Sequence, residues 1–201
     1  MPRIFSIRPT WSMKGRRSQG LRGFSGKPFH PPLTDFPIVC YTVAALFDLI
    51  SFFSDPSHPR AEDFYEAATF VMVVGFVVSL LTALTGFFDW WKGIPRDRSA
   101  GWLGRAKHTQ VWRTINFHAT VMVVVTVITL LDVILRLADF QQPQTSGLLL
   151  ILSLLSAGGV LFGSAYGGTL VFEYAFNVEN LEEPWKESEE DHVRTPRGGG
   201  A

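Results

Sequence analysis

Histidines beside and inside long apolar segments are the residues of this chain whose chemistry is most informative. His118 is the only ionisable side chain in the eighteen-residue segment 114–131, TINFHATVMVVVTVITLL. A helix of this length extends about 27 Å at roughly 1.5 Å per residue, which is close to the thickness of the hydrocarbon layer of a bilayer. An imidazole that faces lipid is costly, so we expect His118 to face a protein interior and to have a function.

A second histidine, His30, precedes the first apolar segment and belongs near the same membrane face as His118. The two histidines could serve as axial ligands of a b-type haem, because haem iron is commonly held by imidazole. Such ligands are best placed on rigid helices, whereas His30 stands before the proline pair Pro31 and Pro32. The haem interpretation is therefore an alternative, and it predicts a Soret band in the purified protein.

Ionisable groups also occur inside the apolar segments, toward the outer face of the membrane. Asp48 is twelve residues past Phe36, about 18 Å along a helix. Asp132 and Arg136 are four residues apart, so they can pair on one helical face. A hydrogen-bonded structural carboxylate is the simpler interpretation of Asp48, and proton or ion handling is the alternative.

Three more carboxylates are expected beside the histidines at the inner face: Asp35, Asp89 and Glu173. Asp35 is predicted to cap the first helix. Asp89 and Glu173 stand at predicted helix C-termini, where the helix dipole disfavours a carboxylate. This mismatch favours pairing with a cation such as Lys92, Arg113 or protonated His118.

Four apolar segments make up most of the chain, with spans of about 36–54, 67–89, 114–136 and 147–172. Each is long enough to cross a bilayer as a helix, whereas irregular backbone or an open sheet would leave backbone groups unpaired in lipid. The predicted fold class is all-α, a polytopic integral membrane protein whose transmembrane domain, residues 33–176, is a four-helix bundle. A basic, flexible N-terminal arm (1–32) precedes this domain, and an acidic C-terminal tail (177–201) follows it.

Charge is segregated along the chain, although the formal net charge is zero. The arm contains seven Lys or Arg and the loop 89–113 contains six, whereas the other two loops contain one each. The positive-inside rule therefore predicts that both chain ends are cytoplasmic. Membrane lipids and further membrane-protein subunits are the expected partners, because a basic arm suits an anionic membrane surface or a subunit. Nucleic acid is not expected as a partner.

Small residues predict how the helices pack, since close approach of helices in lipid relies on them. Gly159, Gly163 and Gly167 recur every four residues in the fourth segment, and Gly75 and Gly86 lie on a similar stripe of the second. Helix packing is one interpretation of these glycines. Room for a flat cofactor or a quinone is the other.

The sequence contains no recognisable catalytic motif. It lacks HExxH, a nucleophile elbow, a phosphate-binding glycine loop and a Cys/His zinc pattern. Cys40 is the single cysteine, so a disulfide framework and a thiolate metal site are excluded. We therefore expect no catalytic residues, no metal-ion site and no enzyme activity.

Several short motifs occur in the order typical of one family: HPPLTDFPI at 30–38, LFDLIS at 46–51, LTALTGFFDWW at 81–91, a histidine early in the third helix, and GGTLVFEYAF at 167–176. Over about residues 28–178 the chain resembles the bacterial four-helix membrane proteins catalogued as domain of unknown function two-two-three-one. The resemblance implies a multi-pass protein of the bacterial inner (cytoplasmic) membrane that accompanies redox systems. The matching positions that could carry function are His30, Asp48, Asp89, His118 and Glu173, and the chain departs from the family at Met122, where a polar residue is frequent.

Three functions stay open. The first is a non-catalytic subunit or accessory protein of a larger respiratory or photosynthetic membrane complex, which fits the glycine-striped helices and the two oppositely charged tails. The second is a b-type haem electron-transfer protein that uses His30 and His118. The third is a small ion or proton transporter that uses Asp48 and His118, although four helices without inverted repeats are a poor transporter pattern.

Overall fold

The computed structural model describes residues 29–94 and 109–177. The predictions for the arm up to residue 28, for residues 95–108 and for the tail from residue 178 lie outside these ranges. The described residues form four helices: α1 (His30–Phe53), α2 (Pro59–Gly93), α3 (Gln110–Ala138) and α4 (Gly147–Phe172). No strand occurs in these two ranges, so the predicted all-α class is confirmed.

Each of the four helices is long and apolar enough to cross a membrane. Their outward faces expose large apolar side chains, such as Phe70 at 61% and Val123 at 63%. A continuous apolar surface of this kind needs an apolar surrounding, which a bilayer provides. The molecule is therefore a four-helix membrane bundle, as predicted.

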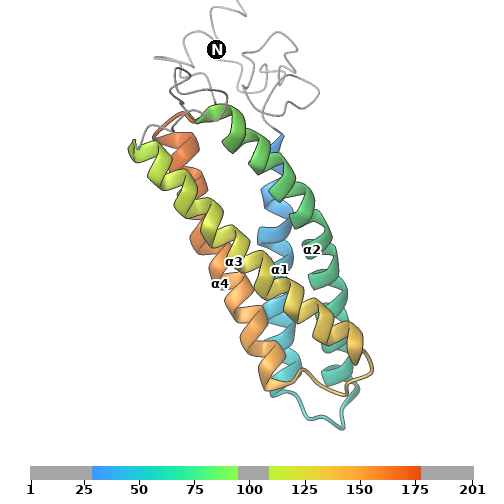
Figure 1. The fold of residues 1–201 in the computed structure, drawn as a ribbon. Helices are drawn as coiled ribbons and strands as arrows, with labels where there is room; N and C mark the ends of the chain where they lie inside the picture. The colour runs from blue at the N-terminus through green and yellow to red at the C-terminus, as the bar shows by residue number, and fades with distance from the viewer. Residues whose placement is uncertain (1–28, 95–108, 178–201) are drawn as a thin grey trace, which may run out of the picture.

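The helices run up and down the bundle (Figure 1). Helix α1 packs against α2 and α4, and α3 packs against α4 and α2, so α1 and α3 are diagonal to each other. The connections 54–58 and 139–146 lie at one end, which we call the loop end, whereas α1 begins and α4 ends at the other, the terminal end. Helices α2 and α3 lie close together near the loop end (Figure 1), and near the terminal end Nε1 of Trp90 on α2 donates to Oδ1 of Asn116 on α3 at 3.3 Å.

The connection between α1 and α2 is a tight turn that starts the second helix. The hydroxyl and the N–H of Ser57 donate to Oδ1 of Asp55 at 2.7 and 2.9 Å, and these hydrogen bonds hold the pKa of Asp55 below its usual value. His58 is the N-cap residue of α2, and its Nδ1 atom accepts from the N–H of Arg60 at 3.1 Å. The turn therefore satisfies its own polar groups outside the apolar region.

Helix α1 begins six residues earlier than predicted. His30 is its first residue, and Pro31 and Pro32 occupy the first turn, where the missing proline N–H groups would have had no helical partner. The prolines therefore start the helix instead of holding His30 outside it. The predicted cap was wrong, because Phe29 is the N-cap residue and Asp35 lies inside the helix. Helices α2 and α3 also extend beyond the predicted spans, whereas α4 matches its prediction.

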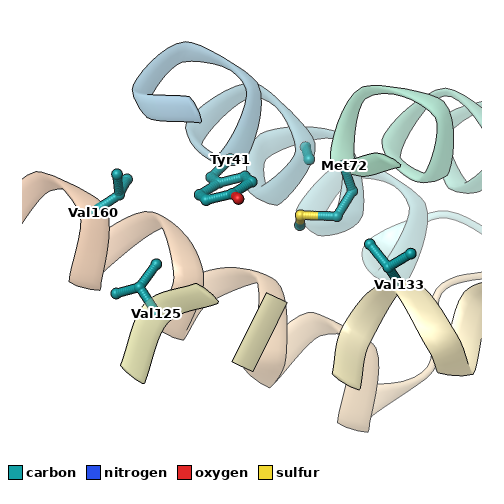
Figure 2. Close-up of a cluster of buried hydrophobic side chains, with 6 residues drawn as sticks. Tyr41, Met72, Val125, Val133 and Val160 are labelled. Atoms are coloured by element: carbon teal, nitrogen blue, oxygen red, sulfur yellow. The ribbon is translucent and has the colours of Figure 1, made fainter. Parts of the chain in front are cut away.

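A buried apolar cluster fills the middle of the bundle and draws one or two side chains from each helix: Tyr41, Ala44, Met72, Val125, Val133 and Val160 (Figure 2). Glycines around this cluster let the helices approach. A Cβ atom at Gly75 would lie 2.6 Å from the Cβ of Cys40, and one at Gly159 would lie 2.5 Å from Cγ2 of Val125. A Cβ at Gly163 would lie 2.5 Å from Sδ of Met122. The space beside these three glycines is therefore filled by side chains of neighbouring helices.

Candidate functional site

His30 lies against α2 at the terminal end. Its Nδ1 atom is 3.0 Å from the carbonyl oxygen of Thr82 and 3.2 Å from Oγ1 of Thr85. A carbonyl oxygen only accepts hydrogen bonds, so this contact requires the proton on Nδ1 and leaves a lone pair on Nε2. Gly86 makes room for the ring, because a Cβ there would lie 2.8 Å from Cε1 of His30.

Pro37, inside α1, helps to create this arrangement. Proline has no N–H, so the carbonyl of Leu33, four residues earlier, loses its helical hydrogen bond. Oγ1 of Thr82 shares its one proton between that carbonyl, at 3.1 Å, and the carbonyl of Val78 on its own helix, at 3.0 Å. The carbonyl of Thr82 accepts from His30. Thr82 therefore joins α2 to α1 twice, and the proline supplies the acceptor for one of the two bonds.

His118 repeats the arrangement in the other half of the bundle. Its Nδ1 atom is 2.8 Å from the carbonyl oxygen of Gly163 on α4. A Cβ at Gly167 would lie 3.2 Å from Cε1 of the ring, so this glycine also makes room for an imidazole. For both histidines the accepting carbonyl stands four residues, or one helical turn, before the glycine that faces the ring.

The two imidazoles come from the diagonal helices α1 and α3 and lie at the same end of the bundle. Neither Nε2 atom makes a hydrogen bond to any described residue. Each ring is therefore held through Nδ1, and its Nε2 atom has no hydrogen-bond partner among the described residues.

The histidines do not belong to a larger metal-binding group. In residues 29–94 and 109–177 no three His, Cys, Asp or Glu side chains are placed to hold one metal ion. A bare zinc ion takes three or four protein ligands. The arrangement instead suits a cofactor that needs only one or two ligands from the protein, such as haem.

Among the predicted inner-face carboxylates, Asp35 and Glu173 make no polar contact with the histidines. Asp35 and Glu173 are exposed, and neither side chain makes a hydrogen bond or an ion pair with a described residue. Asp35 lies off the buried face of α1, and Glu173 follows the last turn of α4. Asp89 is 8% exposed, and its backbone carbonyl accepts from Nδ2 of Asn177 at 3.0 Å.

The chain after α4 folds back toward the end of α2, an arrangement that was not predicted from the sequence. Ala175 and Asn177 have φ angles of 45° and 57°, so the backbone turns through the left-handed region. The turn places the rings of Tyr174 and Phe176 on a small apolar cluster, which contains Trp90, Ile94, Val111, Trp112, Ile115 and Leu170. This cluster links the ends of α2, α3 and α4 beside the histidines. The aromatic residues in the run 172–176 were the feature of the sequence from which this contact could have been predicted.

A family model described as "Predicted membrane protein (DUF2231)" matches residues 26–180. The chain belongs to this family. The match covers all four helices and both histidines, and it confirms the family indicated by the sequence motifs. No curated protein and no solved structure matches the chain.

The DUF2231 region contains a second polar site, at the loop end, centred on Arg136. Its guanidinium donates from Nη2 to Oδ2 of Asp48 at 2.5 Å, from Nε to Oδ1 of Asp132 at 2.9 Å, and from Nη1 to Oγ1 of Thr69 at 3.3 Å. All three charged side chains are fully buried. The predicted pairing of Asp132 with Arg136 is confirmed, and Asp48 is the second carboxylate on the same guanidinium.

Further hydrogen bonds tie this site of the DUF2231 protein to the connection before α4. Oγ1 of Thr145 donates to Oδ1 of Asp48 at 2.9 Å, and the N–H of Thr145 donates to Oγ of Ser51 at 2.9 Å. The Cζ atom of Arg136 lies 5.7 Å from the ring centre of Tyr65, within cation–π range. These partners were not predicted from the sequence, although an arginine in an apolar segment is itself a signal that several acceptors surround it.

Proposed function

We propose that this DUF2231 protein is a membrane electron-transfer protein that holds a b-type haem between His30 and His118. The observation that carries the proposal is the state of the two imidazoles. Each donates a hydrogen bond from Nδ1 to a backbone carbonyl and keeps Nε2 without a partner among the described residues. A hydrogen bond at the other ring nitrogen is what fixes the tautomer and orientation of a metal-ligating histidine.

The location of the histidines supports this assignment. Both belong to helices, and each ring is seated against a glycine of a neighbouring helix. The objection that His30 stands outside a rigid element does not apply, because the proline pair lies within α1. The apolar cluster around Ile115 and Leu170 gives the terminal end a surrounding suited to a largely apolar macrocycle.

A single haem accepts and releases one electron at a time, so this function requires an electron donor and an electron acceptor. We therefore propose that the protein works as a non-catalytic subunit or accessory protein of a larger membrane redox complex in the bacterial inner membrane. The terminal end would face the cytoplasm, because the arm of residues 1–32 and the loop 89–113 carry most of the basic residues.

The test is an optical spectrum of the full chain purified in mild detergent after growth with a haem precursor. We expect the Soret and α bands of a bis-histidine haem and one extractable haem b per chain. His30→Ala and His118→Ala should each abolish the bis-histidine spectrum. His58→Ala is the matched control, because His58 is exposed and caps α2 at the loop end.

Two results would overturn the proposal. One is a wild-type protein that is folded and has no Soret band. The other is a haem spectrum that is unchanged in both His30→Ala and His118→Ala. Proteins that co-purify with the wild type would identify donor or acceptor candidates, and a chain that is always isolated alone would contradict the subunit proposal but not the haem site.

A further inference from the structure

The buried cluster of Asp48, Asp132 and Arg136 at the loop end has an unequal number of positive and negative groups. Two carboxylates share one guanidinium, and all three side chains are fully buried. From this cluster we infer a membrane-embedded proton-binding site, in which the carboxyl group of Asp132 takes up the proton. The inference is independent of the haem proposal, because the cluster lies at the opposite end of the bundle.

The charge count requires a positive partner for this cluster. With both carboxylates ionised, the cluster would carry one uncompensated negative charge among fully buried side chains, which is strongly unfavourable. The neighbours do not supply the missing charge. Helix α2 presents Tyr65, whose hydroxyl donates to the backbone oxygen of Asp139, and α4 carries no charged side chain. One bound proton makes the cluster neutral.

The hydrogen bonds decide which carboxyl group takes the proton. Both oxygens of Asp48 are occupied, Oδ2 by Arg136 and Oδ1 by the hydroxyl of Thr145. Oδ1 of Asp132 accepts from Nε of Arg136, whereas its Oδ2 is buried and has no hydrogen-bond partner. A proton on Oδ2 removes the negative charge from the only carboxylate oxygen of the cluster that has no donor.

A proton fits this position better than a metal cation does. Sodium-like or divalent cations need several oxygen ligands, and within the described residues no group of three His, Cys, Asp or Glu side chains could hold a metal ion. Oδ2 of Asp132 is a single unoccupied oxygen, which is enough for a proton.

The test is infrared spectroscopy of the folded full-length protein, with and without ¹³C-labelled aspartate, titrated from alkaline to mildly acidic pH in H₂O and D₂O. We expect a carboxylic-acid C=O band that shifts with ¹³C-aspartate and with D₂O. Asp132→Asn should lose this band. Asp48→Asn should lose it as well, because the remaining acid and guanidinium then form a neutral ion pair. The band should persist in Asp139→Asn, an exposed aspartate at the same end.

Thermal unfolding of the variants gives a second measurement. While Asp132 holds its proton, Asp132→Asn replaces one neutral group with another of the same shape, so its unfolding temperature should equal that of the wild type. A large fall in that temperature would show that Asp132 acts as a carboxylate. The absence of an aspartate-derived acid band at every pH at which the wild type is folded, or its survival in Asp132→Asn, would overturn the inference.

Discussion

The two ends of the bundle use buried polar groups in opposite ways. At the loop end, Arg136 donates to side chains from α1, α2 and its own helix α3, and only one carboxylate oxygen of the cluster has no partner. At the terminal end, each histidine uses one ring nitrogen within the protein. A network in which nearly every polar atom has a hydrogen-bond partner is typical of a structural role. Two imidazoles that each use only one ring nitrogen in a hydrogen bond are typical of a ligand site.

The same contrast appears in which helices the contacts join. Arg136 connects the pair α1 and α2 to the pair α3 and α4, through Asp48 and Thr69. The histidine contacts stay within the pairs, because His30 bonds to α2 and His118 bonds to α4. At the terminal end the two pairs are joined by other contacts, because Nε1 of Trp90 on α2 donates to Oδ1 of Asn116 on α3 at 3.3 Å and the cluster around Ile115 links the ends of α2, α3 and α4. A haem held by both histidines would add a connection between α1 and α3 at this end.

The largest expected effect comes from removing the guanidinium at the loop end. Arg136→Ala leaves two carboxyl groups buried without their donor, which should destabilise the protein by about 3–5 kcal/mol. Chemical unfolding followed by circular dichroism measures the difference. Arg60→Ala is the control, because Arg60 is exposed, and its unfolding free energy should stay within about 0.5 kcal/mol of the wild-type value. Equal stabilities of the two variants would contradict a structural role for the loop end.

A smaller effect on stability, with a complete loss of ligand binding, is expected at the terminal end. Gly167→Leu places a side chain where the ring of His118 lies, at a cost of about 1–3 kcal/mol. It should also abolish the haem spectrum by displacing the imidazole. Gly168→Leu is the neighbouring control, since a Cβ there would meet only the ring of Phe172, at 3.8 Å. A folded Gly167→Leu protein that retains the wild-type spectrum would show that His118 is not a ligand.

The fold was predictable because long apolar segments in lipid have few structures open to them. The spacing of Asp132 and Arg136 also predicted their pairing, since both lie on one helix. The contact between Asp48 and Arg136 was not predictable from spacing, because it depends on which helices become neighbours. The acceptors of the two histidines were not predictable either, because they are backbone carbonyls, which every residue has.

The start of α1 shows a different limit of prediction from the sequence. Prolines both end helices and begin them, and the pair Pro31 and Pro32 was interpreted as a break before the first span. That interpretation removed His30 from the helix and weakened the haem hypothesis. The inner-face grouping of Asp35 and Glu173 with the histidines rested on depth along the helix alone. Depth does not determine the direction around the helix axis, and both carboxylates are exposed.

The smallest expected effect concerns the hydrogen bond that Pro37 makes available. Thr82→Val removes the donor to the carbonyl of Leu33, which should cost about 0.5–1.5 kcal/mol because Pro37 has no N–H to replace it. Thr42→Val is the control, since Oγ1 of Thr42 bonds only within its own helix, to the carbonyl of Ile38. Adding Pro37→Ala to Thr82→Val restores an N–H for Leu33 and should recover most of the lost stability. The coupling between the two substitutions measures this bond directly. Additive effects would mean that the proline and the threonine act separately. In that case His30 is held against α2 by the hydrogen bond of its Nδ1 atom alone.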